Sequence, residues 1–212
     1  MNSPQFDEAF RAKLRELFEW RRDVRHFRSD PVDGAVLERL VRTASLAPSV
    51  GFSQPWRFVC VDDAARRDAV VASFERANAG ALAEYGDDDA ARYARLKLAG
   101  LREAPVHLAV FNDESTQVGR GLGTRTMPET RAYSTAVAVY TFWLAARAEG
   151  IGVGWVSILE PHQVERALDV PAQWTLVAYL CVGYPKEEHD TPELLRAGWE
   201  FRDERATTLH RR

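Results

Sequence analysis

Apolar residues recur at helical spacing in the first fifty positions of the chain. Near the N-terminus they predict a helix that begins at Ser3 and Pro4, with the hydroxyl as its cap and proline in its first turn. The apolar positions of this helix are Phe6, Phe10, Leu14, Leu17 and Phe18. A second helix is predicted after a capping Asp33, and it stops before Pro48. The first helix therefore ends at the basic stretch "RRDVR", residues 21–25.

Short apolar runs bounded by turn residues predict strands farther along the chain. The runs are "WRFVCVDD" from residue 56, "VHLAVF" from residue 106, "GVGWVSIL" from residue 152 and "WTLVAYLCVGY" from residue 174. Helices are predicted from about residue 63 and over "PHQVERAL". The mixed order of helices and strands indicates one layered domain over residues 1–212, of the α+β or α/β class.

Three longer segments have a distinct character. Residues 131–149 are apolar on nearly every side, which predicts a helix that is buried in the core or against a partner chain. Residues 79–100 are expected to form a helical excursion over the surface, in the manner of a lid. The polar, glycine-bearing residues 113–130 are predicted to be the most mobile loop.

Composition excludes several classes of function. With 28 basic and 31 acidic residues the net charge is −3, so we expect neither nucleic acid nor an anionic membrane as a partner. No apolar run approaches the roughly 20 residues that a membrane span needs, and the charged N-terminus is unlike a signal peptide, which favours a cytoplasmic protein. Cys60 and Cys181 are expected to be reduced core residues, and the five scattered histidines predict no metal site.

Two stretches carry candidate chemistry. Arg21, Arg22 and Arg25 can bind a phosphate through forked guanidinium groups, or they can be a solvated end of a helix. In "APSVGFSQPWRF", Ser49 offers a hydroxyl and Gly51 a bare backbone to a ligand, although the loop can also be a plain connection. No Walker segment and no dinucleotide-binding glycine motif is present.

Taken in order, "RRDVRHF", "APSVGFSQPWRF", "RLKLAG", "LAARAEGIGVGWVSI" and "VGYP" resemble the FMN-binding nitroreductase superfamily. The resemblance spans nearly the whole chain. It implies a nitroreductase-like α+β fold, with a central, mostly antiparallel sheet flanked by helices, and a homodimer that binds FMN at the subunit interface. Such a dimer would explain the apolar helix over residues 131–149.

Within that superfamily the chain looks like the BluB family of 5,6-dimethylbenzimidazole synthases. Ordinary nitroreductases usually have a hydroxyl residue at the position of Asp23, an asparagine at that of Phe52, and often a glutamate near Ser157. The BluB family consumes reduced FMN and dioxygen to make the lower ligand of cobalamin. The implied substrates are therefore reduced FMN and dioxygen, with a flavin reductase as a possible further partner.

The resemblance also implies roles for individual residues. The cofactor-binding set is Arg21, Arg22, Asp23, Val24, Arg25, Ser49, Gly51, Leu98 and Ser157. Asp23 and Ser157 are the catalytic candidates, and Leu98 would close over the flavin ring. Flanking arginines offset the charge of the Asp23 carboxylate, which could accept a hydrogen bond or a proton from the flavin. An ion pair of Asp23 with Arg25 or Arg22 is the structural alternative. Lys186 and Arg202 both stay open as the C-terminal cation at the phosphate.

Phe52, Leu98, Trp155 and Val156 are expected to line a dry pocket, because fragmentation of the flavin requires exclusion of water. Two other functions compete with this hypothesis. An NAD(P)H-dependent nitroreductase would recycle its FMN over many turnovers. A non-catalytic flavin-binding protein would protect reduced FMN from oxygen and form no fragmentation product.

Overall fold

The computed structural model of the chain describes residues 3–212. Four strands form one sheet in the order β1-β2-β4-β3, and each neighbouring pair is antiparallel. The strands are β1 (Trp56–Cys60), β2 (Val106–Asp113), β3 (Gly152–Val156) and β4 (Trp174–Gly183). The predicted α+β class and the antiparallel sheet flanked by helices are confirmed.

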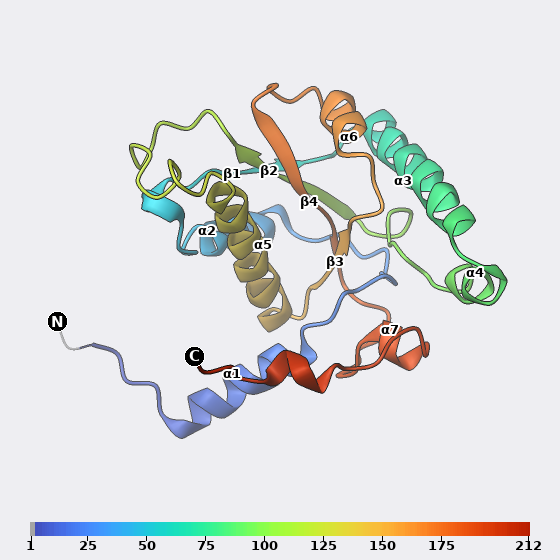
Figure 1. Cartoon of the computed structure of the whole chain (residues 1–212), viewed down its shortest axis with the longest axis horizontal. Helices are drawn as coiled ribbons and strands as arrows, with labels where there is room; N and C mark the ends of the chain where they lie inside the picture. The colour runs from blue at the N-terminus through green and yellow to red at the C-terminus, as the bar shows by residue number, and fades with distance from the viewer. Residues whose placement is uncertain (1–2) are drawn as a thin grey trace.

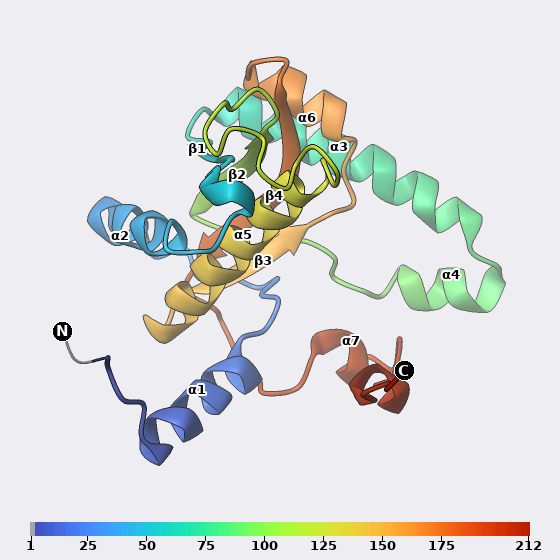
Figure 2. The same cartoon turned by 60° about the vertical axis from the view of Figure 1, so that its left-hand side comes forward.

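Helices cover both faces of this sheet. They are α1 (Glu8–Trp20), α2 (Gly34–Ala44), α3 (Ala64–Glu84), α4 (Asp87–Tyr93), α5 (Thr130–Ala148), α6 (Pro161–Leu168) and α7 (Glu193–Arg196), with 3-10 turns η1 (Val50–Phe52) and η2 (Glu204–Thr207). Figures 1 and 2 show α2 and α5 on one face of the strands, and α3 and α6 on the other. Within residues 3–212, none of the helices has the length and apolar character needed to cross a bilayer.

Successive side chains of each strand point to opposite faces of the sheet, so that a hydrophobic core forms on each face. Leu108 and Val110 of β2 pack with Phe142 of α5. Their neighbour Phe111 points to the opposite face, where it packs with Val164 of α6. Because both faces are covered, the central strands β2 and β4 are apolar throughout most of their length.

One polar pair lies inside this core. The Nδ1 atom of His107 is 2.9 Å from the hydroxyl of Tyr179, and both side chains are buried. Burial, and secondarily the charge of Arg67, lowers the pKa of His107 to about 4. The imidazole is therefore neutral at physiological pH.

Two predictions are corrected by the structure. The first helix begins at Glu8 rather than at Ser3 and Pro4, because the carboxylate of Asp7 caps it by accepting the Phe10 N–H at 2.8 Å. Cys181 is buried as predicted, but Cys60 is exposed because it is the last residue of β1, a strand at the edge of the sheet.

Several elements project from the layered body. Helix α1 has no buried residue, and α1, α4 and α7 lie away from the sheet in both views (Figures 1 and 2). The lid segment, residues 79–100, comprises the end of α3, then α4, then turns. Its Tyr85 and Tyr93 contact Trp199 of the C-terminal segment, residues 185–212. The centroid of the Trp199 ring lies 5.5 Å from that of Tyr85 and 6.1 Å from that of Tyr93. The lid segment and the C-terminal segment are thereby joined.

Candidate functional site

The sequence "RRDVRHF", residues 21–27, is the arginine-rich stretch, and it runs along the free edge of β3. Asp23 forms a parallel bridge with Val153, and the Val24 N–H donates to the Val153 carbonyl at 3.0 Å. Two glycines of β3 permit this approach, because a Cβ on Gly152 would lie 2.8 Å from the Val24 side chain and one on Gly154 would collide with the Val24 carbonyl oxygen. The pattern "GVG" therefore positions residues 23 and 24 directly against the strand.

Both carboxylate oxygens of Asp23 accept hydrogen bonds. Oδ1 accepts the backbone N–H of Trp155 at 2.9 Å, and Oδ2 accepts Nε of Arg25 at 2.9 Å. The side chain keeps 32% of its surface exposed. The ion pair considered as the structural alternative is thus present, yet a carboxylate oxygen has more than one lone pair and the exposed part can still accept from a ligand.

The three arginines have different surroundings. Arg25 is enclosed, with 11% of its side chain exposed, and its NH1 donates to the Lys97 carbonyl at 2.9 Å. Arg21 lies over the ring of Trp143 at 4.8 Å, and its Nε is buried without a hydrogen-bond partner. Nε of Arg22 donates to the carbonyl of Asp190 at 2.8 Å. Burial, then the charges of Arg21 and Arg202, lowers the pKa of Arg22.

A cavity of about 330 Å³ opens between this stretch and the C-terminal segment. Its walls are Arg22, Asp23, Val24, Arg25, His26, Glu187, His189, Thr191, Glu193, Arg196 and Ala197. Guanidinium and carboxylate groups face each other across it, since Glu193 lies 4.0 Å from Arg25, and the imidazole of His26 lies at the same distance from Glu193. The wall of the cavity therefore carries guanidinium and carboxylate groups in equal number, three of each.

Leu98 and Ser157 flank this site. Leu98 is half-buried and follows Lys97, whose carbonyl is bound by Arg25. Ser157 is exposed just beyond the end of β3, two residues after Trp155, whose N–H is bound by Asp23. The structure therefore brings the lid segment and the end of β3 to the same stretch of arginines.

Ser49 and Gly51 lie elsewhere on the chain. The N–H of Val50 donates to Ser134 in the first half of α5, whereas the indole of Trp143 near its other end donates to the Arg22 carbonyl. These two contacts on α5 are nine residues apart (143 minus 134), or about 13 Å along a helix. Within one chain, the loop of Ser49 is not assembled with the arginines.

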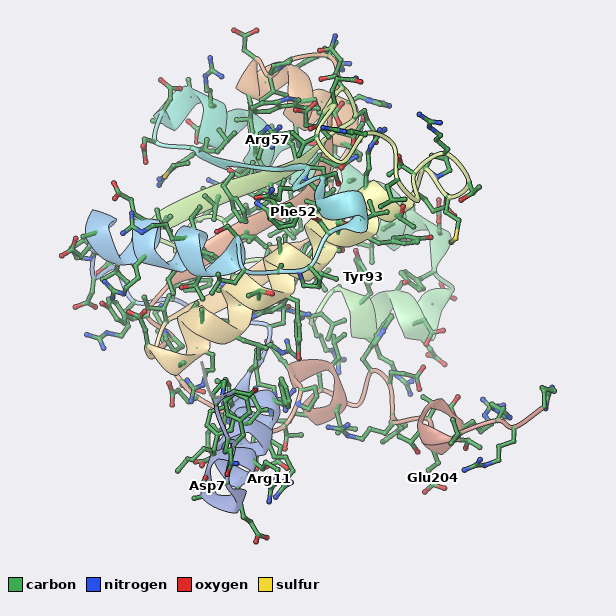
Figure 3. The ribbon with its side chains drawn as sticks, turned by 90° about the vertical axis from the view of Figure 1, so that its left-hand side faces the viewer. Asp7, Arg11, Phe52, Arg57, Tyr93 and Glu204 are labelled. Atoms are coloured by element: carbon green, nitrogen blue, oxygen red, sulfur yellow. The ribbon has the colours of Figure 1, made fainter. Side chains whose placement is uncertain are left out.

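The contacts of this loop show what Ser49 and Gly51 do within one chain. Ser49 Oγ accepts the Gln54 N–H at 3.1 Å, and Gly51 has φ +56° with Leu122 O only 2.7 Å from where a Cβ would lie. Gly51 is needed to pack residues 113–130 against η1. Phe52 was expected to line a dry pocket, but 72% of it is exposed on η1 (Figure 3).

Sequence reasoning missed Glu103 and Glu193. Glu103 contacts Lys97, the Phe27 N–H and Lys186, and Glu193 faces Arg25 and His26. Nothing in the local pattern of either residue signals these roles, because every partner except Lys97 is distant in sequence. Among residues 3–212, no group of three His, Cys, Asp or Glu side chains could hold a metal ion.

Residues 18–184 match the model of the nitroreductase family. The chain belongs to this family. The predicted resemblance is confirmed, and it extends to particular members. A 5,6-dimethylbenzimidazole synthase of Rhodospirillum rubrum is 61% identical over 94% of each chain. A second protein of that name, from Rhodobacter capsulatus, is 50% identical over 92% of this chain and 94% of its own.

Solved structures of family members agree with the fold. An iodotyrosine deiodinase bound to FMN and 3-iodo-L-tyrosine superposes with a TM-score of 0.70, at 26% identity over 83% of this chain and 91% of that one. A BluB-like flavoprotein from Clostridium difficile has a TM-score of 0.68 over 93% of this chain and 99% of its own. At 20% identity the latter supports the fold alone.

Proposed function

We propose that this nitroreductase-family protein is a 5,6-dimethylbenzimidazole synthase that fragments reduced FMN with dioxygen. The observation that carries the proposal is the 61% identity to a synthase over nearly the full length of both chains. The site is consistent with it, since the Asp23 carboxylate is held by the Trp155 N–H and by Arg25 in the wall of a cavity that Arg22 also lines.

The residues present fit FMN. The buried Nε of Arg21 lacks a hydrogen-bond partner, which a phosphate oxygen would supply. Arg22 and Arg202 add positive charge at the same place, whereas Nζ of Lys186 lies 3.6 Å from Glu103. Arg202 is therefore the better candidate for the C-terminal cation at the phosphate. When bound, reduced FMN supplies the electrons for dioxygen and the ring that is fragmented.

We propose that FMN binds between two copies of the chain. Ser49 and Gly51 would come from a second copy, because one chain holds them and the arginines at separate levels of α5. Tyr133, Val137 and Tyr140 lie on one exposed face of α5, which is an apolar surface suited to a dimer interface. The exposed Phe52 would be covered there.

Asp23 and Ser157 are the proposed catalytic residues. The Trp155 N–H fixes one oxygen of Asp23, so the carboxylate is aimed before any ligand binds and can accept a proton from a flavin or ribityl hydroxyl. Ser157 has one donor and two acceptor sites for the ring edge. Leu98 and the lid segment would exclude water, which otherwise favours release of peroxide and return of oxidised FMN.

The test uses chemically reduced FMN, so that no flavin reductase is needed. Protein and reduced FMN are mixed without oxygen, air is admitted, and 5,6-dimethylbenzimidazole is measured by chromatography. Asp23→Asn should bind oxidised FMN within about threefold of wild type but lose nearly all product, because the amide is no base. Asp30→Asn, the same change in an aspartate paired with Arg28 at the surface, is the matched control and should form product normally.

The alternatives give different results. Oxidised FMN and peroxide as the only products would refute the synthase function, and rapid reduction of bound FMN by NAD(P)H would then favour a nitroreductase. Prolonged survival of reduced FMN in air would indicate a flavin-binding protein without catalytic activity.

A further inference from the structure

Three segments meet at the carboxylate of Glu103. One oxygen pairs with Nζ of Lys97 in the lid segment. The other accepts the N–H of Phe27, at the end of the arginine-rich stretch, at 3.2 Å, and lies 3.6 Å from Nζ of Lys186 at the start of the C-terminal segment. Only 27% of the Glu103 side chain is exposed, so these contacts are partly shielded from solvent.

Lys97 is held at both of its ends. Its carbonyl accepts NH1 of Arg25 at 2.9 Å, and its ammonium group pairs with Glu103. Arg25 in turn donates to Asp23. A continuous chain of polar contacts therefore connects the catalytic candidate Asp23 to the residue that precedes Leu98.

The ionisation of Glu103 is consistent with its contacts to two lysines. Burial alone would raise the pKa of Glu103, but the hydrogen bonds from Lys97 and the Phe27 N–H, together with the charges of Lys97 and Lys186, outweigh burial and lower the pKa. The carboxylate is therefore ionised at neutral pH, and both lysines face it as counter-ions.

We propose that Glu103 is a positioning residue that acts through Lys97 to hold the lid segment closed beside the flavin. This inference rests on the proposed function and deepens it, because it names the contact that keeps the site dry. Glu103 touches no reacting atom. It determines where Lys97 and Leu98 lie relative to Asp23.

The position of the lid segment would decide the fate of reduced FMN. With the segment open, water enters, and reduced FMN passes two electrons and two protons to dioxygen, giving oxidised FMN and hydrogen peroxide with no carbon–nitrogen or carbon–carbon bond broken. With the segment closed, fragmentation of the flavin competes with this formation of peroxide. We call the contact between Glu103 and Lys97 the clamp. Its loss should therefore lower the yield of 5,6-dimethylbenzimidazole per FMN consumed, while FMN consumption continues.

The experiment compares the full-length variants Glu103→Gln, Lys97→Met and their double mutant with wild type. The matched control is Glu75→Gln, which removes the same charge from a surface pair with Arg102, one residue before Glu103. One readout is the ratio of 5,6-dimethylbenzimidazole to oxidised FMN after air is admitted to protein with reduced FMN. The other is hydrogen–deuterium exchange of the amides of residues 94–100 in the FMN-free protein.

We expect each single variant to lower the product ratio and to speed exchange of residues 94–100 by up to about fivefold, the limit for a partly exposed ion pair. The double mutant should be no worse than Glu103→Gln alone, because both single substitutions remove the same Glu103–Lys97 ion pair. Glu75→Gln should match wild type in both readouts.

The inference is overturned if Glu103→Gln keeps the wild-type ratio and exchange, or if the two single effects add in the double mutant. A wild-type protein that forms no 5,6-dimethylbenzimidazole would refute the proposed function instead. The clamp is then judged by exchange alone, where equal rates in Glu103→Gln and wild type overturn it.

Discussion

The packing of residues 23 and 24 on Gly154 allows a quantitative test of how the site is built. In Gly154→Ala the new methyl group would meet the Val24 carbonyl oxygen, and the carbonyl carbon would be only 3.2 Å away. Neither atom is the end of a flexible side chain, so the stretch must move off β3. The substitution therefore separates the arginine-rich stretch from the sheet without changing any polar group.

The expected cost follows from the two hydrogen bonds that this movement breaks. The Val24 N–H to Val153 bond is between neutral groups and contributes about 0.5–1.5 kcal/mol, and the Trp155 N–H to Asp23 bond involves a charge and contributes about 1.5–3 kcal/mol. Together they predict a loss of about 2–4.5 kcal/mol in the free energy of unfolding. FMN affinity should fall as well, because the arginines are carried with the stretch.

Urea unfolding followed by tryptophan fluorescence, at one protein concentration, measures the first quantity, and fluorescence titration with FMN measures the second. Gly80→Ala is the matched control. A Cβ at Gly80 meets nothing within 4 Å inside α3, so this change should stabilise the protein by about 0.5–1 kcal/mol. A Gly154→Ala protein with wild-type stability and FMN affinity would refute the reasoning.

Three further predictions concern other contacts. Arg21→Lys keeps the charge but loses the forked donor and the contact over Trp143, so FMN affinity should fall about tenfold or more in a fluorescence titration; unchanged affinity would remove Arg21 from the phosphate site. His107 has a pKa of about 4 in the folded chain and 6.5 as its ordinary value, so the unfolded chain binds the proton first, and stability should fall by up to about 3 kcal/mol as pH drops from 6.5 to 4. His107→Gln should flatten that part of a plot of Tm against pH, and an unchanged slope would assign the effect to other groups. Trp199→Ala removes the aromatic contacts with Tyr85 and Tyr93 and should increase trypsin cleavage in residues 85–97, whereas wild-type cleavage would show that the C-terminal segment does not restrain α4.

Local patterns were sufficient to predict most of the elements. Asp33 caps α2 as its position before an apolar periodic stretch predicted, and the four predicted runs begin at the first residues of the four strands, although their ends differ. The predicted start of α1 is wrong because the Asp7 carboxylate caps the helix, and only the structure shows its hydrogen bond with the Phe10 N–H. The exposure of Cys60 depends on which strand lies at the sheet edge, and that is a property of topology rather than of local sequence.

The site was harder to predict than the elements. The resemblance identified "RRDVR" and Leu98, which the structure brings together through Arg25 and the Lys97 carbonyl. Residue spacing could not show that Asp23 satisfies a strand N–H as well as an arginine, nor that Gly51 serves the packing of residues 113–130. Glu103 was missed because its partners lie 6, 76 and 83 positions away, the last being 186 minus 103.

The separation of Ser49 and Asp23 along α5 has a genetic consequence if each flavin is shared by two subunits. A cell that makes one copy disabled at position 23 and another disabled at position 49 would assemble mixed pairs in which one of the two sites carries both defects and the other carries neither. Two alleles that are inactive alone would then form 5,6-dimethylbenzimidazole when they are expressed together. Residues that act together within one subunit, such as Asp23 and Arg25, offer no such rescue.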